Sequence, residues 1–515
     1  MARVRIGFGV FLFLTSFQAA RAQTPPSNPA TPPEVPVFEE AIDVRVVNVE
    51  VVVTGEDGKP VRGLAAADFR LLVDGAEVPL DYFTEIAEGQ AAPAAPAAPQ
   101  GPAAPVAPAE AVARSYLVFI DDSFSVASPR NQVLERLAAD LSSSLAPGDR
   151  MAVLAFDGRR IEVLSPWSAD RAALARVLEA AGGRPAHGHQ MIAADRSLGG
   201  DVDITFDAAS SMELTHEELQ QMLDTLGRRV NPEARTQLGR TAAAMAGALR
   251  GFEAPPGRKI MLLLSGGWSL TVAPRLFGPL VESANRLGYT LYPIDVAQGD
   301  ARVLRGLDRL AVATGGRVAN SVRQDVLRTV AADSGTYYWL GFAPAWKKDD
   351  RTHDIRVEVR RPDLKVRARS GFSDLSRRTE VAQKAESVLL FGGAGEERRV
   401  RVELGTARPV GRRSREVEVP VTLGVPVEAL ALTPADGGGY IAEVPLGIAA
   451  VDEKGGRSEL PGSRLRIAVQ KAPPAGGFAR FRTVLKLRHV AQRLVFTVPD
   501  TVNGNVLWGE AELSF

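Results

Sequence analysis

The stretch LVFIDDSFS, residues 117–125, decides the fold and carries the most informative side chains of the chain. It begins as an apolar run typical of a buried strand and ends in a tight loop with a carboxylate and two hydroxyls. Asp121, Ser123 and Ser125 follow one another at D-x-S-x-S spacing. Hard divalent cations take oxygen ligands, so this spacing is typical of a metal-binding loop, although aspartate and serine are also common turn and helix-cap residues.

Strands and helices alternate around this stretch. We expect strands at 116–120, 151–156, 161–164, 259–264 and 289–296, and helices at 133–145, 172–181, 274–287 and 302–313. This alternation predicts an α/β fold, a doubly wound and mostly parallel sheet covered on both faces, with one antiparallel edge from the hairpin at Asp157-Gly158. Ligands of such sheets bind beyond the carboxyl ends of the strands, where Asp121 is expected.

Composition shifts divide the 515 residues into segments. We expect a signal peptide at 1–22, a disordered spacer at 23–40, a small β-module at 41–86, an Ala/Pro-rich linker at 87–112, the doubly wound domain at 113–375 with an insertion at 183–233, a connector at 376–398 and a β-sandwich-like domain at 399–515. The strands expected after Gly335 are assigned to the doubly wound domain, as strands that close it.

The N-terminus has the order of a secretory signal peptide. Arg3 and Arg5 precede an apolar run at 6–17, and Ala20-Arg21-Ala22 offers a cleavage site. The run is too short to span a membrane, and the absence of cysteine excludes a lipid-anchor cysteine, disulfides and thiolate metal sites. We therefore expect an exported protein, periplasmic or secreted, with no transmembrane segment and no lipid anchor.

Charge and motif content argue against two function classes. The chain holds 61 Lys and Arg against 61 Asp and Glu, so no net field recruits nucleic acid. Ser265 lacks the G-x-S-x-G elbow of hydrolases, and no glycine-rich dinucleotide loop follows the first strand. His187 and His189 form the one close histidine pair, which is typical of a solvated loop. We expect no catalytic residues, no cofactor-binding residues and no enzyme activity.

The insertion at 183–233 has two interpretations. It is polar and glycine-rich at first, and Thr215-His216-Glu217-Glu218 then forms a capping-box pattern that opens an expected helix. This segment forms either a flap near the candidate metal loop or an extra helix packed on the side of the domain.

Several motifs in order resemble one protein family. They read VRGL at 61–64, DF at 68–69, DG at 74–75, RKI at 258–260, YYWLGF at 337–342 and VRARSGF at 366–372. Over about residues 44–372 the chain resembles the von Willebrand factor A-related proteins of Acidobacteria and allied bacteria. The resemblance implies a von Willebrand A, Rossmann-like fold, and it implies that the D-x-S-x-S loop is a metal-ion-dependent adhesion site.

The resemblance also implies two further ligand loops. Thr241 is the best candidate for the second loop, with Thr236 behind it, although Thr241 also fits the N-cap of an expected helix at 241–249. The third loop offers an aspartate in the family, and Gly266 stands there instead. The implied metal ligands are thus Asp121, Ser123, Ser125 and Thr241. Since affinity depends on charged oxygens, we expect weak or no Mg²⁺ or Ca²⁺ binding, unless Asp122 compensates rather than pointing to solvent.

Two functions remain open on the sequence. The first is an exported, non-enzymatic binding or adhesion module that holds a protein or peptide partner at a partly degenerate site around Asp121. As the resemblance implies, an acidic residue of the partner would complete the shell of the cation. The second is a metal-free structural scaffold protein of the cell envelope. The loss of the acid at Gly266 favours the second function, and the intact Asp121, Ser123 and Ser125 favour the first.

Overall fold

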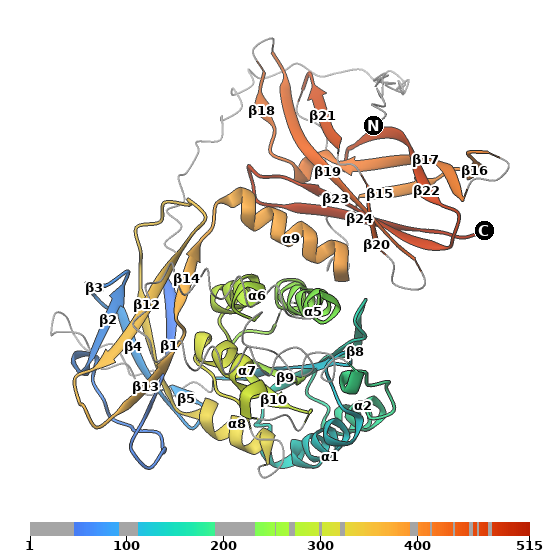
Figure 1. Ribbon diagram of the computed structural model, residues 1–515. Helices are drawn as coiled ribbons and strands as arrows, with labels where there is room; N and C mark the ends of the chain where they lie inside the picture. The colour runs from blue at the N-terminus through green and yellow to red at the C-terminus, as the bar shows by residue number, and fades with distance from the viewer. Residues whose placement is uncertain are drawn as a thin grey trace, which may run out of the picture. The chain divides into compact units, whose positions relative to one another are not determined.

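The computed structural model describes most of the chain from Val46 onward (Figure 1). The described residues are 46–91, 112–190, 232–252, 254–266, 273–297, 301–319, 325–391, 400–411, 415–435, 438–452, 457–460, 463–471 and 476–515. The expected signal peptide, the expected spacer and the expected helix after Thr215 lie outside them. No helix within these ranges combines the length and apolarity that a membrane span needs.

A five-stranded sheet forms the middle of the described chain, in the order β10-β9-β6-β7-β8. Its strands are β6 (Arg114–Asp121), β7 (Arg150–Phe156), β8 (Ile161–Ser168), β9 (Arg258–Ser265) and β10 (Tyr289–Asp295). Neighbouring strands are parallel except β7 and β8, which form the predicted antiparallel edge. The strand order reverses direction at β6, so the carboxyl ends of β6 and β9 border the place where ligands of such sheets bind.

Helices cover both faces of this sheet, as the alternating pattern predicts. The helices are α1 (Ala127–Ser144), α2 (Arg171–Ala181), α5 (Pro232–Gly251), α6 (Ala273–Leu287), α7 (Ala301–Ala313) and α8 (Val326–Gly335). Residues 116–120 of β6 are fully buried and alternate between two apolar clusters. Leu117 and Phe119 join residues of α5, α6 and α7, whereas Val118 joins residues of α1, α2 and α8. We call this part, residues 114–335, the parallel-sheet domain.

Strands on either side of the parallel-sheet domain in sequence pair with one another. One sheet has the order β13-β1-β11-β4-β5 and a second the order β14-β12-β2-β3. The strands are β1 (Val47–Thr54), β2 (Phe69–Val73), β3 (Ala76–Val78), β4 (Tyr82–Ala87), β5 (Gln90–Ala91), β11 (Tyr337–Phe342), β12 (Arg351–Val359), β13 (Lys365–Ala368) and β14 (Gly371–Asp374). We call these nine strands the β-unit. They share an apolar cluster that includes Val49, Leu71, Leu340 and Phe372.

The strand pairing within the β-unit corrects two expectations. β11 to β14 do not close the parallel sheet, because β11 and β13 pair with β1, and β12 pairs with β2. The residue pattern predicted strands in these segments, but it could not predict pairing partners that lie almost 300 residues away. The stretch from residue 87 to 91 belongs to the β4–β5 hairpin rather than to a linker. Residues 92–111 of the expected linker lie outside the described residues.

The final region is β-rich, as its turn spacing predicts. One sheet joins β15 (Arg401–Leu404), β16 (Arg408–Pro409), β17 (Glu416–Pro426) and β22 (Phe478–Arg488). The other joins β18 (Thr433–Pro434), β19 (Tyr440–Asp452), β20 (Arg457–Glu459), β21 (Ser463–Val469), β23 (Gln492–Pro499) and β24 (Val506–Leu513). Val419 of β17 and Phe496 of β23 belong to one apolar cluster. Helix α9 (Arg377–Phe391) connects β14 to this region and packs on Trp508 of β24.

A buried ion pair connects the β-unit to the parallel-sheet domain. Nε of Arg258, at the start of β9, lies 3.1 Å from Oε2 of Glu50 in β1. The Arg258 guanidinium is almost fully buried, stacks 4.0 Å from the ring centre of Tyr337 and donates to the carbonyl oxygen of Ser334. Burial raises the pKa of Glu50, and the charge of Arg258 opposes that rise.

We expect Glu50→Gln to destabilise the protein, because it leaves the buried Arg258 charge without its partner. Breaking a buried pair in this way costs about 3 kcal/mol or more. The change in the free energy of unfolding is measured from the urea-induced transition in which the parallel-sheet domain unfolds. The matched control is Glu77→Gln, which removes an ion pair with the exposed Arg70. Loss of this exposed pair should change the free energy of unfolding by less than about 0.5 kcal/mol. Equal effects of the two substitutions would contradict the assignment of the Glu50 pair as a structural contact.

Candidate functional site

The carboxylate of Asp121 lies at the carboxyl end of β6, where the order of the sheet reverses. It is fully buried, and both oxygens accept hydrogen bonds. Oδ2 accepts from the Ser265 hydroxyl at 2.7 Å, and Oδ1 accepts from the amide of Ser123 at 3.1 Å. Ser265 ends β9, the strand beside β6, so the parallel register brings these two side chains together.

Burial controls the ionisation of Asp121. It raises the pKa of the carboxyl from its ordinary value of 3.8 to about 7, against the opposing effect of the hydrogen bonds from Ser265 and Ser123. The carboxyl group is therefore close to half protonated at neutral pH when no cation is bound.

The two serines of the loop are also engaged within the protein. The Ser125 hydroxyl donates to the carbonyl oxygen of Asp121 at 2.5 Å. The Ser123 hydroxyl accepts from Nε2 of Gln237 at 3.0 Å, and the same nitrogen lies 3.3 Å from the carbonyl oxygen of Gly158. Gln237 comes from α5 and was not anticipated from the sequence. Its position one helical turn before Thr241 is the pattern that could have identified it.

Thr241 lies inside a helix rather than at its head. Helix α5 begins at Pro232, nine residues earlier, so the expected helix start at 241 is wrong and an N-cap role for Thr241 with it. Proline suits the first turn of a helix, and residues 233–240 contain several strong helix formers. The hydroxyl of Thr241 is fully buried and has no hydrogen-bond partner among the described residues. Thr236 is exposed on the same helix.

Asp122 faces two arginines rather than solvent. Its Oδ1 accepts from Nη1 of Arg130 at 3.1 Å, and its Oδ2 accepts from Nε of Arg184 at 2.9 Å. The Arg130 side chain is fully buried. Burial raises the pKa of Asp122, and both guanidinium charges oppose the rise. Because these contacts occupy both oxygens, Asp122 does not supply the charge that is missing at Gly266.

The first residues of the insertion cover the loop. The amide of His187 donates to the carbonyl oxygen of Asp122 at 2.8 Å, and the amide of Gly188 donates to that of Ser125 at 2.9 Å. A Cβ atom at Gly188 would lie 2.5 Å from the Ser125 oxygen, so only glycine allows this approach. These contacts place residues 187–188 beside the loop, and both interpretations of the insertion stay predictions. Residues 191–231 lie outside the described residues.

Gly266 is held in a space that excludes a side chain. A Cβ atom there would lie 2.3 Å from the Cβ atom of Ala297 and 2.9 Å from Oδ1 of Asp295. The loop after β10 therefore occupies the volume that an acid at position 266 would need. An aspartate cannot be accommodated without a shift of the neighbouring loop.

These contacts decide how well the residues suit a divalent cation. Asp121, Ser123 and Ser125 offer hard oxygen atoms, and the unpartnered hydroxyl of Thr241 is compatible with a missing ligand. Against this stand the engagement of both Asp121 oxygens in hydrogen bonds, the two arginines on Asp122 and the closed space at Gly266. Tight Mg²⁺ or Ca²⁺ sites use several charged oxygens, so the donor set fits such a cation poorly.

Comparisons with known proteins give distant similarity only. No protein-family model and no curated protein sequence matches the chain. The N-terminal domain of TFIIH p34 is 15% identical, with 42% of this chain and 94% of that chain covered and a TM-score of 0.20. The von Willebrand factor domain of Mfa5, a type V pilus tip protein from Porphyromonas gingivalis, is 11% identical, with 43% and 95% covered and a TM-score of 0.24.

A third solved structure, a β-glucosidase from Listeria innocua in complex with isofagomine, is 9% identical. The match covers 55% of this chain and 39% of that chain, at a TM-score of 0.13. TM-scores this low do not establish a shared fold over the whole chain. The mixed α/β architecture with several sheets follows from the strand order and pairing given above.

We expect the stability of the metal-free protein to fall as pH rises through the range set by Asp121. Between its unfolded pKa of 3.8 and its folded pKa of about 7, the native state binds more protons than the unfolded state. The free energy of unfolding therefore decreases with pH across that window, by about 2 to 3 kcal/mol between pH 5 and pH 8. Denaturant unfolding in chelator should show this loss in the wild type and not in Asp121→Asn. The exposed Asp363→Asn serves as control, and parallel profiles for wild type and Asp121→Asn would contradict the assignment.

We expect Gly266→Ala to destabilise the protein by about 1 to 3 kcal/mol, because the added methyl group overlaps Ala297. The matched control is Gly278→Ala in helix α6, where an added Cβ atom meets nothing within 4 Å. Alanine is the better helix former, so the control should be neutral or stabilising by up to about 1 kcal/mol. Thermal unfolding of the two variants measures the difference, and equal stabilities would show that position 266 has room for an acid.

Proposed function

We propose that this chain is an exported, non-enzymatic protein-binding module of von Willebrand A type. In this proposal the carboxyl edge of the parallel sheet, around the loop 121–125, forms the binding edge. The observation that carries the proposal is the convergence of Asp121, Ser123 and Ser265 at the point where the strand order reverses. Such points are where open α/β sheets bind their ligands.

The same proposal assigns the metal a minor role. The hydrogen bond between Ser265 and Asp121 links β9 to β6 at the position where a cation would otherwise join the two loops. Partner recognition would then depend on exposed groups around the loop, such as Arg159, His187 and His189. The flanking β-strands would act as sandwich-like spacers or additional contact surfaces. The signal-like N-terminus supports export, and N-terminal sequencing of the mature protein tests it.

A non-enzymatic role is supported by the burial of the polar groups. A nucleophile must reach its substrate and have a base beside it. Ser265 has a carboxylate partner, but its side chain and that of Asp121 are fully buried. The equal numbers of acidic and basic residues in turn favour a protein or peptide partner over a nucleic acid.

The alternative is a metal-free structural scaffold protein of the cell envelope. The cover of the Asp121 loop by Gly188 favours this alternative, because a covered loop offers no direct contact to a partner. Under the scaffold hypothesis, substitutions at the loop edge leave all interactions of the chain unchanged.

We expect millimolar Mg²⁺ or Ca²⁺ to change the thermal unfolding midpoint of the wild type by no more than about 1 °C relative to chelator, since weak ligands stabilise little by mass action. Asp121→Ala serves as the matched variant. A rise of several degrees in the wild type that disappears in Asp121→Ala would restore a cation-dependent site.

We expect the binding edge to be detected by charge reversal at Arg159, which lies in the exposed loop between β7 and β8. The wild type and the control Arg356→Glu, an exposed position on β12, should retain the same partner from an envelope fraction, whereas Arg159→Glu should lose most of it. Cross-linking followed by mass spectrometry compares the amount of this partner that is captured by the three proteins. Equal retention by all three proteins would favour the scaffold alternative.

A further inference from the structure

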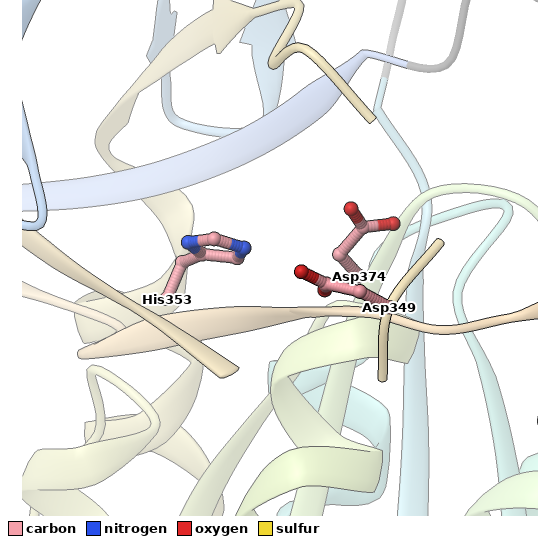
Figure 2. A group of neighbouring side chains, drawn as sticks. All are labelled: Asp349, His353 and Asp374. Atoms are coloured by element: carbon pink, nitrogen blue, oxygen red, sulfur yellow. The ribbon is translucent and has the colours of Figure 1, made fainter. Parts of the chain in front are cut away.

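Three side chains of the β-unit converge away from the Asp121 loop. Asp349, His353 and Asp374 each offer one ligand atom, and these three atoms lie within 4.8 Å of one another, with the side chains next to each other (Figure 2). His353 lies on β12, and Asp374 ends β14. The register pairs Arg351 with Asp374 and His353 with Phe372, so His353 and Asp374 are diagonal neighbours on one face of the ladder.

Asp374 presents one oxygen without a partner. The residue is 2% exposed, and its Oδ2 accepts from the amides of Lys347 at 2.6 Å and Lys348 at 2.9 Å. These two bonds fix the carboxylate. Its Oδ1 is buried and has no hydrogen-bond partner among the described residues. A buried carboxylate oxygen without a partner is costly, which indicates that a ligand is missing beside it.

His353 is oriented in the way that metal-binding histidines are. Its Nδ1 lies 2.7 Å from Oδ2 of Asp74, and its ring stacks on Phe372 with centroids 4.9 Å apart. Asp74 is fixed in turn, because its Oδ1 accepts from the amide of Asp354 at 3.0 Å. When Nδ1 donates its proton to a carboxylate, Nε2 carries the free lone pair. A carboxylate behind a histidine in this manner is the common outer-shell partner of a metal ligand.

Asp349 closes the third side from the loop that precedes β12. Its side chain is exposed, and Oδ1 accepts from the amide of Arg351 at 3.2 Å. Ligand atoms around a tetrahedral Zn²⁺ lie about 3.4 Å apart, given metal–ligand distances near 2.1 Å. The ligand atoms of the cluster lie within 4.8 Å of one another, and an exposed loop aspartate is able to move inward.

We propose that Asp349, His353 and Asp374 bind a transition-metal cation of the Zn²⁺ class, with a fourth coordination position open to water. An imidazole together with two carboxylates suits Zn²⁺, whereas Mg²⁺ and Ca²⁺ take oxygen ligands alone. The two carboxylates balance the charge of the ion. This site is independent of the proposed function at Asp121, since it lies on other strands and takes another class of metal.

The ion would cross-link the loop before β12, the strand β12 and the end of β14. The amide of Asp350 already donates to the carbonyl oxygen of Asp374 at 2.8 Å, and the carboxylate of Asp350 accepts from the amide of Ser376 at 2.7 Å. Helix α9 starts at Arg377. The metal would therefore stabilise the point at which the β-unit passes into the connector helix.

Isothermal titration of the tag-free full chain with Zn²⁺ tests the proposal. We expect the wild type to have a site that is lost, or weakened at least about tenfold, in Asp374→Asn and His353→Gln. Removal of the outer-shell carboxylate in Asp74→Asn should weaken it by about 10- to 100-fold. Mg²⁺ at millimolar concentration should not compete. Thermal unfolding in chelator confirms that Asp374→Asn, which keeps the shape of the side chain, is folded.

Two controls separate this site from other zinc ligands. Asp363→Asn changes an exposed aspartate in the loop between β12 and β13. The double variant His187→Gln/His189→Gln removes the one close histidine pair of the sequence. Both variants should bind Zn²⁺ as the wild type does. The proposal is overturned if the wild type binds no Zn²⁺, if Asp374→Asn and His353→Gln bind as tightly as wild type, or if the double variant alone loses the site.

Discussion

The antiparallel pairing of β1 with β11 and β13 is the constraint on which the rest of the structure depends. The chain leaves the β-unit after β5, builds the whole parallel-sheet domain and returns to the β-unit at β11. Entry and exit meet at Gly89, whose amide donates to the carbonyl oxygen of Gly335 and whose carbonyl oxygen accepts from the amide of Val112. The parallel-sheet domain is therefore an insertion into a β-unit, and the two are not successive modules on a string.

Burial raises the pKa of two adjacent aspartates of the parallel-sheet domain, Asp121 and Asp122, but the groups that oppose this rise differ. Asp122 is compensated by two guanidinium groups, whereas the donors to Asp121 among the described residues are a hydroxyl and backbone amides. Neutral donors compensate a buried carboxylate less well than charged ones, which explains why the pKa of Asp121 rises to about 7. The hydroxyl of Ser265 thus provides part of the stabilisation that a cation would provide, without its charge.

Local patterns were sufficient to predict the strands of the parallel-sheet domain and most of its helices, whereas the start of α5 and the whole of α8 were not predicted. Its strands are short apolar runs, and its helices repeat apolar residues at helical spacing, as Val133, Leu137 and Leu141 do in α1. The partners of β1 could not be predicted, because antiparallel pairing across almost 300 residues leaves no local signal. For this reason residues 337–374 were expected to belong to the parallel-sheet domain, whereas their strands belong to the β-unit.

The sequence predicted the position of the candidate site in the sheet, but it did not predict most of the contacts around it. The loop 121–125 lies where the strand pattern placed it. The sequence could not predict the contacts of Gln237, Arg130 and Gly188, because they depend on how α5, α1 and the insertion fold against the loop. The environment of Asp122 could not be predicted for the same reason, since its two oxygens are occupied by Arg130 and Arg184, which are brought there by packing.

The meeting of entry and exit at Gly89 has a mechanical consequence. Tension applied between a point before β1 and the C-terminal strands passes from β1 to β11 and β13, and on through β14 into helix α9. As long as these ladders hold, the load bypasses the parallel-sheet domain, whose two ends are fastened to each other. A protein stretched between two attachment points would in this way keep the loop at Asp121 unstrained while its β-strands bear the force.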